Sequence, residues 1–374
     1  MRIFITILLF LTVIPTSVVY AGDQANWITE FDTRMKEEMR ENKIPGMAVA
    51  LVHGNNTVLA KGYGLRDIEN NLAVDENTLF NIASTHKSMN AMLIATLVDD
   101  NVVSWDTPVS TYYPGFRLRS QASTNSVTLS HLLSMSSGIP ASVEDHLPLE
   151  ATPLDVFETA RQSILLGAPL EQFSYSNISA AIAGYIGVIA NGADDLDLFD
   201  DYAALLQSKI LNPIGMSRST IYASEAREGG NLSKAYDVSN TGEPIYVRSN
   251  DLDGDALAPS GSLKSSAKEM ALFISTQLNR GLAPNGARVV SSENLVKTWQ
   301  PITGDYALGW WKTSYKNTYV IMHTGSYDGF VSVLALVPSD NVGLVLMANS
   351  EAAAGDLTEY AHEILVDVLK ESKL

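Results

Sequence analysis

Strand-like segments lie near both ends of this chain and are separated by a long stretch of helical pattern. Near the start, Pro45-Gly46 precedes an apolar run over residues 47–52, and a second run follows over residues 57–64 after a turn rich in Gly and Asn. Three further segments of strand pattern, joined by polar turns, lie near the other end: 318–322, 330–337 and 342–347. Short strands joined by such turns predict hairpins. We therefore expect one antiparallel sheet built from both ends of the chain.

Helical patterns flank and separate these strands. Apolar residues at three- and four-residue spacing predict one helix around residues 27–42 and a last helix around residues 357–369. The middle, residues 84–259, carries helical patterns and long connections. We predict an α/β (α+β) fold in which residues 22–83 and 260–374 form a helix-flanked antiparallel sheet domain and residues 84–259 form a mostly helical domain.

The charge and the cysteine count exclude several function classes. The chain has 374 residues and a formal net charge of −17, which repels nucleic-acid phosphates and anionic membrane surfaces. It has no Cys, which removes thiolate nucleophiles, disulfides and Cys-ligated metals. The six His residues are scattered, and His362-Glu363 has no second His at metalloprotease spacing. We expect no metal and no cofactor.

The first residues have the pattern of an export signal. Arg2 is followed by an apolar stretch from Ile3 to Ile14, and Val19-Tyr20-Ala21 offers small residues where a signal peptidase cleaves. We predict a signal peptide over residues 1–21 and a periplasmic or secreted mature protein that is not held at a membrane. An uncleaved membrane anchor is the alternative, although the run is short for a bilayer of ~30 Å.

The candidate nucleophile is Ser84. It lies where an apolar extended segment, Phe80-Asn81-Ile82, meets an amphipathic helix, so its backbone N–H lies at the helix start, where negative charge is stabilised. Lys87 lies one turn later on the same face and can reach the hydroxyl. A serine becomes a nucleophile when a neighbouring base takes its proton. The alternative role for Ser84 is an ordinary N-cap, as expected for Ser266 with Glu269 in a second Ser-x-x-Lys pattern.

Two further motifs follow Ser84 in order. Tyr175-Ser176-Asn177 precedes a predicted helix, and His323-Thr324-Gly325-Ser326 lies at the end of a predicted strand. The similar patterns Tyr315-Lys316-Asn317 and Ser339-Asp340-Asn341 occur in the wrong context, before a strand and in a hairpin turn.

Ser84-x-x-Lys87, Tyr175-x-Asn177 and His323-Thr324-Gly325 resemble the three motifs of the penicillin-recognising serine hydrolases. The chain is most similar to the branch that holds class C β-lactamases, D-alanyl-D-alanine carboxypeptidases, D-aminopeptidases and related esterases. Three other stretches agree with that branch: Leu129–Pro140, Asn212–Met216 and Pro259–Leu263. The resemblance implies an active site in a cleft between the sheet domain and the helical domain.

The resemblance also implies a role for each site residue. Ser84 is the nucleophile, and Lys87 and Tyr175 are the proton-transfer pair, with the identity of the base left open. We expect the Lys87 ammonium to lower the Tyr175 pKa. Further expected roles are donation by Asn177 to Lys87 or to the substrate amide, an oxyanion hole formed by the backbone N–H groups of Ser84 and Ser326, and contacts from His323, Thr324 and Gly325 to a substrate carboxylate or carbonyl.

Two departures from class C β-lactamases bear on the substrate. That class usually has Lys where this chain has His323, and usually has Gln at about the position of Ala141-Ser142. We therefore predict an exported hydrolase that cleaves a D-amino-acid peptide or a related amide or ester through a Ser84 acyl-enzyme. A class C-like β-lactamase and a penicillin-binding sensor without turnover are the alternatives. The expected partner is a small-molecule or peptide substrate, and the oligomeric state stays open.

Overall fold

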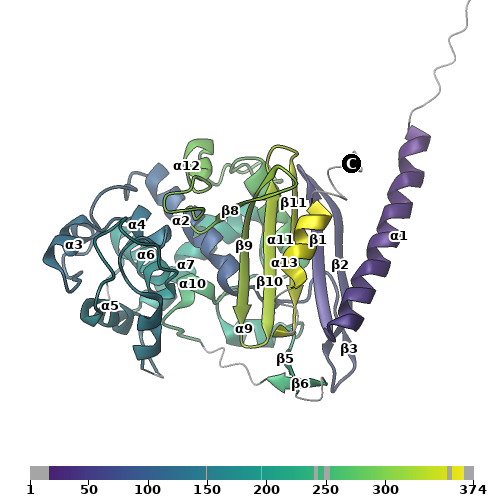
Figure 1. Cartoon of the computed structure of the whole chain (residues 1–374), viewed down its shortest axis with the longest axis horizontal. Coiled ribbons are helices and arrows are strands. Elements are labelled where there is room, and N and C mark those ends of the chain that lie inside the picture. The colour runs from purple at the N-terminus through teal and green to yellow at the C-terminus, as the bar shows by residue number, and fades with distance from the viewer. Residues whose placement is uncertain are drawn as a thin grey trace, which may run out of the picture.

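The computed structural model describes residues 17–148, 150–194, 196–239, 243–247, 253–351 and 356–365. A seven-stranded antiparallel sheet forms one side of the molecule, and helices form the other (Figure 1). The strand order is β3-β2-β1-β11-β10-β9-β8, so the first and last long strands are neighbours. The bounds are β1 Gly46–His53, β2 Asn56–Asp67, β3 Leu72–Ala73, β8 Trp311–Tyr315, β9 Thr318–Tyr327, β10 Phe330–Val337 and β11 Val342–Ala348.

The sheet joins both ends of the chain through an antiparallel β1–β11 pair, in which Met47 pairs with Ala348 and His53 pairs with Val342. The sequence predicted the two early strands and the three late ones. It missed β8, and it ended β9 at Met322, whereas this strand continues to Tyr327 and contains the third motif. The expected antiparallel sheet with flanking helices is confirmed.

Alternate residues of β1 pack on opposite faces of the sheet. Met47, Val49 and Leu51 contact the core under α1 (Ser17–Glu41) and α13 (Asp356–Glu363). Ala48 and Ala50 face the larger core, which continues through α11 (Ala267–Leu278) into the helical part. Because side chains alternate along a strand, one apolar run serves both layers.

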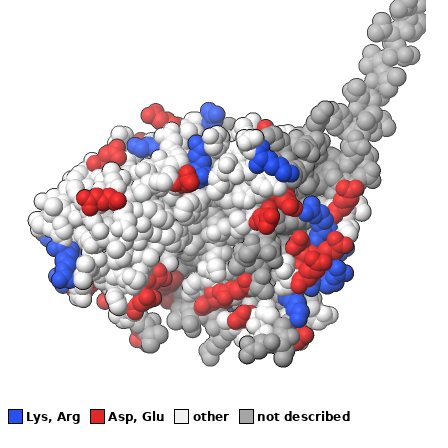
Figure 2. Space-filling view, in the orientation of Figure 1, with Lys and Arg blue, Asp and Glu red and all other residues white. Residues whose placement is uncertain are grey.

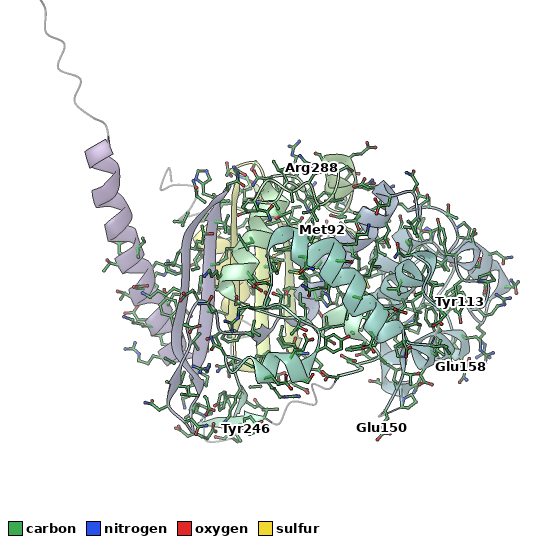
Figure 3. The ribbon with its side chains drawn as sticks, turned by 180° about the vertical axis from the view of Figure 1, so that it is seen from behind. Met92, Tyr113, Glu150, Glu158, Tyr246 and Arg288 are labelled. Atoms are coloured by element: carbon green, nitrogen blue, oxygen red, sulfur yellow. The ribbon has the colours of Figure 1, made fainter. Side chains whose placement is uncertain are left out.

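The helical part surrounds α2 (His86–Asp99) and α6 (Asn177–Ala190), which pack against each other and are both almost wholly buried. The other helical segments are η2 Val109–Thr111, α3 Gln121–Ser126, α4 Leu129–Leu133, η3 Ala141–His146, α5 Pro153–Gln162, α7 Leu198–Leu206, η4 Gln207–Leu211, α8 Asn212–Ile214, α9 Ala223–Glu228, α10 Ala258–Gly261 and α12 Ser292–Lys297. Seen from behind, Met92 lies on α2 inside the molecule, and Tyr113 and Glu158 lie at the far helical end (Figure 3).

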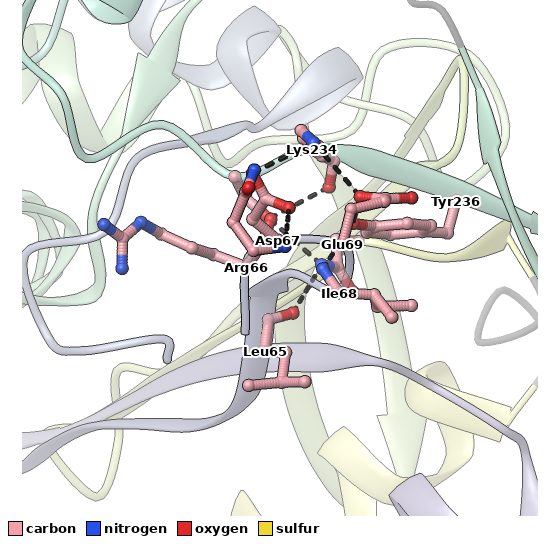
Figure 4. A network of polar contacts seen from close by, with 10 residues as sticks. Leu65, Arg66, Asp67, Ile68, Glu69, Lys234 and Tyr236 are labelled. Atoms are coloured by element: carbon pink, nitrogen blue, oxygen red, sulfur yellow. Dashed lines mark hydrogen bonds and ion pairs between the residues drawn. The ribbon is translucent and has the colours of Figure 1, made fainter. Parts of the chain in front are cut away.

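One segment departs from the predicted division at residues 84 and 259. β5 (Ala235–Val238) and β6 (Pro244–Val247) form a hairpin beside the sheet, and Tyr246 lies at the sheet end of the molecule (Figure 3). Lys234 forms ion pairs with Asp67 at 2.9 Å and Glu69 at 3.1 Å, and Tyr236 donates to Glu69 at 3.0 Å (Figure 4). These contacts fix the hairpin to the end of β2, a long-range arrangement that helical periodicity does not reveal.

Charged side chains of both signs are interspersed on the face shown in Figure 2, most densely at the sheet end. The predicted signal peptide, residues 1–21, lies outside the described residues except for residues 17–21, which belong to α1. Within the part of the chain that the structure describes, no helix combines the length and the apolar character that a membrane span requires.

Candidate active site

Ser84 lies on a tight turn between a short strand and the buried helix α2. β4 (Phe80–Asn81) pairs with β7 (Lys264–Ser265), and the turn η1 (Ala83–Thr85) follows. Ala83 has a φ of 48°, in the left-handed region that an alanine rarely adopts. Its N–H donates to Asn81 Oδ1 at 2.8 Å, which helps to hold this conformation. Such strain is common at functional sites, where the surrounding structure imposes it.

Lys87 is fully buried, and its ammonium has three acceptors. Nζ lies 2.9 Å from Ser84 Oγ, 2.7 Å from Asn177 Oδ1 and 2.9 Å from the carbonyl oxygen of Ser260 in α10. The structure thus brings together the first two motifs that the sequence singled out. The Ser260 carbonyl was not predicted as a member of the site.

Burial lowers the pKa of Lys87 to about 7, and the nearby Glu144 carboxylate opposes this shift. A lysine with an ordinary pKa of ~10.4 is charged at neutral pH and cannot accept a proton. At a pKa of about 7, a large fraction of Lys87 is neutral. Lys87 can therefore take the proton of the Ser84 hydroxyl from 2.9 Å away.

Tyr175 lies beside both groups, but its pKa moves in the direction opposite to the sequence-based expectation. Lys87 Nζ lies 4.9 Å from the Tyr175 ring centre, and the Tyr175 hydroxyl is within hydrogen-bonding reach of Ser84. Burial raises the Tyr175 pKa above its usual value, and the hydrogen bond with Ser84 offsets only part of that rise. The expected lowering by Lys87 is wrong because the buried phenolate loses its hydration.

Asn177 accepts a hydrogen bond from Lys87 rather than donating one to it. Because its Oδ1 faces Lys87, its Nδ2 points the other way and donates to Glu144 Oε2 at 2.8 Å. Glu144 lies on η3 and is half-buried, and burial raises its pKa. The sequence analysis missed Glu144. It has no local pattern, and only the packing of η3 against α6 brings it to Asn177.

The third motif reaches the turn that carries Ser84 through close backbone packing. A Cβ on Gly325 would lie 2.6 Å from the Ile82 carbonyl oxygen and 2.8 Å from the Ser84 nitrogen. A glycine is therefore needed where β9 meets η1. Thr324 is half-buried beside it, and Ser326 is exposed and paired with Val331 of β10. The structure thus places the third motif against the turn that carries Ser84.

His323 is buried, and both of its ring nitrogens have partners inside the protein. Nδ1 lies 2.6 Å from the Thr324 carbonyl oxygen, which requires a proton on Nδ1, so Nε2 accepts from the Tyr306 hydroxyl at 3.0 Å. Burial and the nearby Lys87 charge lower the His323 pKa to about 3. His323 is therefore neutral at pH 7 and has no N–H left to donate to a substrate. This arrangement argues against the expected contact between the His323 side chain and a substrate carboxylate or carbonyl.

An aromatic cluster supports this side of the site. Tyr306 packs edge-on against Trp311, Tyr175 and His323, with ring centres 4.7, 6.1 and 5.8 Å away, and Phe173 contacts Tyr306 and Trp311. The sequence analysis did not find Tyr306, because nothing near it in sequence indicates its partner His323.

The alternative serine and tyrosine patterns lie in structural positions. Ser266 is the N-cap of α11 and accepts from the Glu269 N–H, as expected, and Ser265 is buried with its hydroxyl bonded to Ser219. Tyr315 ends β8 and stacks on His362. Across the described residues, no group of three or more His, Asp or Glu side chains is arranged to hold a metal ion.

Comparisons with known proteins agree with this architecture. A family model described as Beta-lactamase matches residues 31–368. Unguisins hydrolase ungD' of Aspergillus campestris is 30% identical over 92% of this chain and 65% of its own length. Protein flp of Staphylococcus aureus strain MRSA252 is 26% identical over 86% of this chain and 62% of its own length. The chain thus spans less than two thirds of the length of these curated relatives.

Solved structures show the same fold. The octameric penicillin-binding protein homologue from Pyrococcus abyssi has a TM-score of 0.78 and 24% identity over 91% of this chain and 77% of its own. A class C β-lactamase from Rhodobacter sphaeroides has a TM-score of 0.67 and 23% identity over 85% of this chain and 93% of its own. The family match over most of the sequence shows that the chain belongs to the Beta-lactamase family.

Proposed function

We propose that this protein is an exported serine hydrolase that cleaves an ester or amide bond through an acyl-enzyme on Ser84. The observation that carries the proposal is the buried Lys87, which lies 2.9 Å from Ser84 Oγ and has a pKa of about 7. A base with a pKa near the working pH combines a large neutral fraction with adequate basicity. The short Ser84–Lys87 distance and the lowered Lys87 pKa therefore support Ser84 as the nucleophile and Lys87 as its general base.

The acylation step follows from this arrangement. Neutral Lys87 takes the Ser84 proton while Oγ forms a bond to the substrate carbonyl carbon, and the carbonyl electron pair moves onto its oxygen. The backbone N–H groups of Ser84 and Ser326 are the proposed donors to that oxyanion, on the adjoining elements η1 and β9. The leaving group departs with a proton from the Lys87 ammonium, passed through the neutral Tyr175 hydroxyl. Water then attacks the acyl carbon and gives a proton to neutral Lys87, which returns it to Ser84 Oγ as the acid product leaves.

The electrostatics of the site favour substrates without an essential carboxylate. The His323 side chain is neutral, and both of its ring nitrogens are bonded inside the protein. The charged group that acts on Lys87 is the Glu144 carboxylate. We infer that uncharged esters, amides and D-amino-acid peptides lacking a free carboxyl end are better substrates than peptides ending in D-Ala-D-Ala. One relative is named a hydrolase of unguisins, and the proposal extends hydrolysis, not that substrate, to this chain.

Covalent labelling tests the nucleophile. A fluorescent fluorophosphonate should label the wild-type protein and the Ser265→Ala variant, and should not label Ser84→Ala. Ser265 is the matched control because it begins the second Ser-x-x-Lys pattern, and its buried hydroxyl is bonded to Ser219. Mass spectrometry of the labelled peptide identifies the site. A label on a serine other than Ser84 would refute the assignment.

A substrate panel tests the reaction class. A nitrophenyl acetate, a D-alanyl anilide, a D-Ala-D-Ala peptide, a fluorescent penicillin and a chromogenic cephalosporin are compared at equal concentrations. The proposal expects turnover of the uncharged ester and the anilide above that of the carboxylate-bearing compounds. Faster turnover of the cephalosporin would favour a β-lactamase, and a stable penicillin adduct without turnover would favour a sensor.

The export part of the proposal rests on Arg2, the apolar stretch Ile3–Ile14 and Ala21. Expression of the full chain in a bacterial host should release a protein into the periplasm or the medium. Its N-terminal sequence should begin at Gly22. An uncleaved protein in the membrane fraction would support the anchor instead.

A further inference from the structure

The catalytic centre contains a carboxylate that the acylation step does not use. Three hydrogen bonds connect Glu144 to the nucleophile: Asn177 Nδ2 donates to Glu144 Oε2 at 2.8 Å, Lys87 Nζ donates to Asn177 Oδ1 at 2.7 Å, and Lys87 Nζ lies 2.9 Å from Ser84 Oγ. Ala141 N–H donates to Ser174 Oγ at 2.9 Å, which fixes η3 to the segment that carries Tyr175.

We propose that Glu144 is a positioning residue that orients the Asn177 amide and stabilises the positive charge that Lys87 acquires when it takes the Ser84 proton. This inference rests on the proposed function. The orientation follows from chemistry: a carboxylate accepts only, so it holds the NH₂ of Asn177 and leaves the oxygen for Lys87. Without that anchor, the amide could turn its NH₂ toward Lys87 and displace the ammonium.

The charge argument follows from the groups around Lys87. Tyr175 is neutral, His323 on β9 and His86 on α2 are neutral because burial lowers the pKa of each to about 3, and α10 contributes only the Ser260 carbonyl. Asp145 and Asp255 act on Glu144 and raise its pKa, as burial does. Glu144 is thus the negative charge that acts on Lys87 and raises the Lys87 pKa against burial.

A carboxylate in this position has two opposite effects on the rate. It favours ammonium in the free enzyme, so it reduces the fraction of neutral Lys87 at low pH. It also favours the ammonium that forms during proton transfer, so it lowers the barrier once the base is neutral. If Glu144 had only a structural role, its replacement would not both move the pH at which activity rises and lower the plateau rate.

Glu144→Gln separates these effects because Gln can still accept from Asn177 but carries no charge. The wild-type kcat/KM on an uncharged nitrophenyl ester should rise with pH and level off above about 7. In Glu144→Gln the rise should move to lower pH by about one unit or more, and the plateau kcat should fall about tenfold, since one pKa unit corresponds to a factor of ten. KM should stay within about twofold.

Three variants make this test specific. Asp145→Asn removes the same charge from the exposed neighbour and should leave the pH profile at its wild-type position. Glu144→Asp keeps the charge and should keep the wild-type rise while lowering kcat. Glu144→Ala should lose more activity than Glu144→Gln because the Asn177 amide loses its anchor. All four proteins are compared by circular dichroism and thermal melting before the kinetics.

The outcomes separate this inference from the proposed function. If Ser84→Ala retains hydrolysis, the proposed function fails. If Ser84→Ala is inactive and Glu144→Gln gives the wild-type profile, the charge role of Glu144 fails alone. If Glu144→Ala is as active as Glu144→Gln, the orienting role fails. A Glu144→Gln enzyme whose rate falls with an unshifted rise also refutes the charge argument. If Glu144→Gln does not fold, the other two variants decide. The charge argument is refuted if the pH profile of Glu144→Asp is shifted as far as that of Glu144→Ala.

Discussion

At the scale of single residues, two buried polar side chains line the site, and burial has a different consequence for each. Lys87 is buried with acceptors that include the Ser84 hydroxyl, so its lowered pKa suits the proposed proton transfer. His323 is buried with both nitrogens bonded to Tyr306 and Thr324, so it holds β9 in place. Burial alone does not distinguish a reactive group from a structural one. The partners of each nitrogen do.

The neutral His323 leads to a prediction about anionic substrates. A peptide ending in a carboxylate and the same peptide ending in an amide are compared from about pH 5.5 to 8, the range in which an ordinary His, with a pKa of ~6.5, loses its charge. Because His323 titrates near 3, the ratio of the two KM values should stay constant. Steady-state kinetics give the ratio. A ratio that climbs several-fold through pH 6.5 would show a charged His323 in contact with the carboxylate.

The sequence could predict those site residues whose relation is local. Ser84 and Lys87 are three residues apart on a helix start, so their contact follows from helix geometry. Asn177 and His323 were found through motifs, but the direction of the Asn177 hydrogen bond and the bonded state of His323 depend on Glu144 and Tyr306. Those two residues reach the site only through tertiary packing, so no spacing in the sequence could indicate them.

At the scale of elements, the contact between β9 and η1 sets the distance between the third motif and Ser84. In Gly325→Ala the new methyl would lie 2.6 Å from the Ile82 oxygen, 2.7 Å from Ser332 Oγ and 2.8 Å from the Ser84 nitrogen. The strand must move, and a shift of about 1 Å at a reacting group commonly costs roughly 100-fold in rate. We expect a loss of that order in kcat/KM on the nitrophenyl ester.

Gly261→Ala is the control for that substitution. Gly261 also lies beside Ala83, but its added methyl would have no neighbour closer than 3.5 Å. Activity should stay within about twofold of wild type, since that distance is an ordinary van der Waals contact. If Gly325→Ala were as active as Gly261→Ala, the close packing of β9 on η1 would not be needed for activity.

The strands differ in how well the sequence predicted them, for physical reasons. β10 and β11 are buried at every position, so their apolar runs stand out. β8 is an edge strand of mixed and partly exposed residues, Trp311 to Tyr315, and carries no clear alternation. β9 was ended too early because His323, Thr324 and Gly325 interrupt its apolar run, although the backbone pairing continues to Tyr327.

At the scale of the whole molecule, Asn349 joins three distant parts of the chain. It is fully buried, accepts from Gly46 N–H at 2.7 Å, and donates to the Leu65 carbonyl at 3.0 Å and to Ser233 Oγ at 3.1 Å. Its own backbone carbonyl accepts from Tyr236 N–H at 2.9 Å. This single side chain connects β1, β2 and the segment leading into the β5–β6 hairpin.

Asn349→Ala should therefore lower the free energy of unfolding by about 1–3 kcal/mol or more, the cost of leaving a buried donor such as the Gly46 N–H without its partner. Urea titration followed by circular dichroism gives the change, and the Ser84 label should persist because the site is intact. Asn125→Ala on the exposed face of α3 should stay within about 0.5 kcal/mol. Similar losses in the two variants would contradict the joining role of Asn349.

The pairing of β1 with β11 also has a consequence for biosynthesis. The turn that carries Ser84 and the helix α2 end by residue 99. β9, which carries Gly325, and β11, which pairs with β1, are translated more than 200 residues later. Contacts between such distant segments form only after a long loop has closed. A nascent chain that still lacks β9 to β11 contains Ser84 and Lys87 but not the strands that pack beside them. The proposed Ser84 site is therefore complete only after β9 to β11 have been translated, and a ribosome-bound intermediate that lacks these strands should not react with a serine-directed probe.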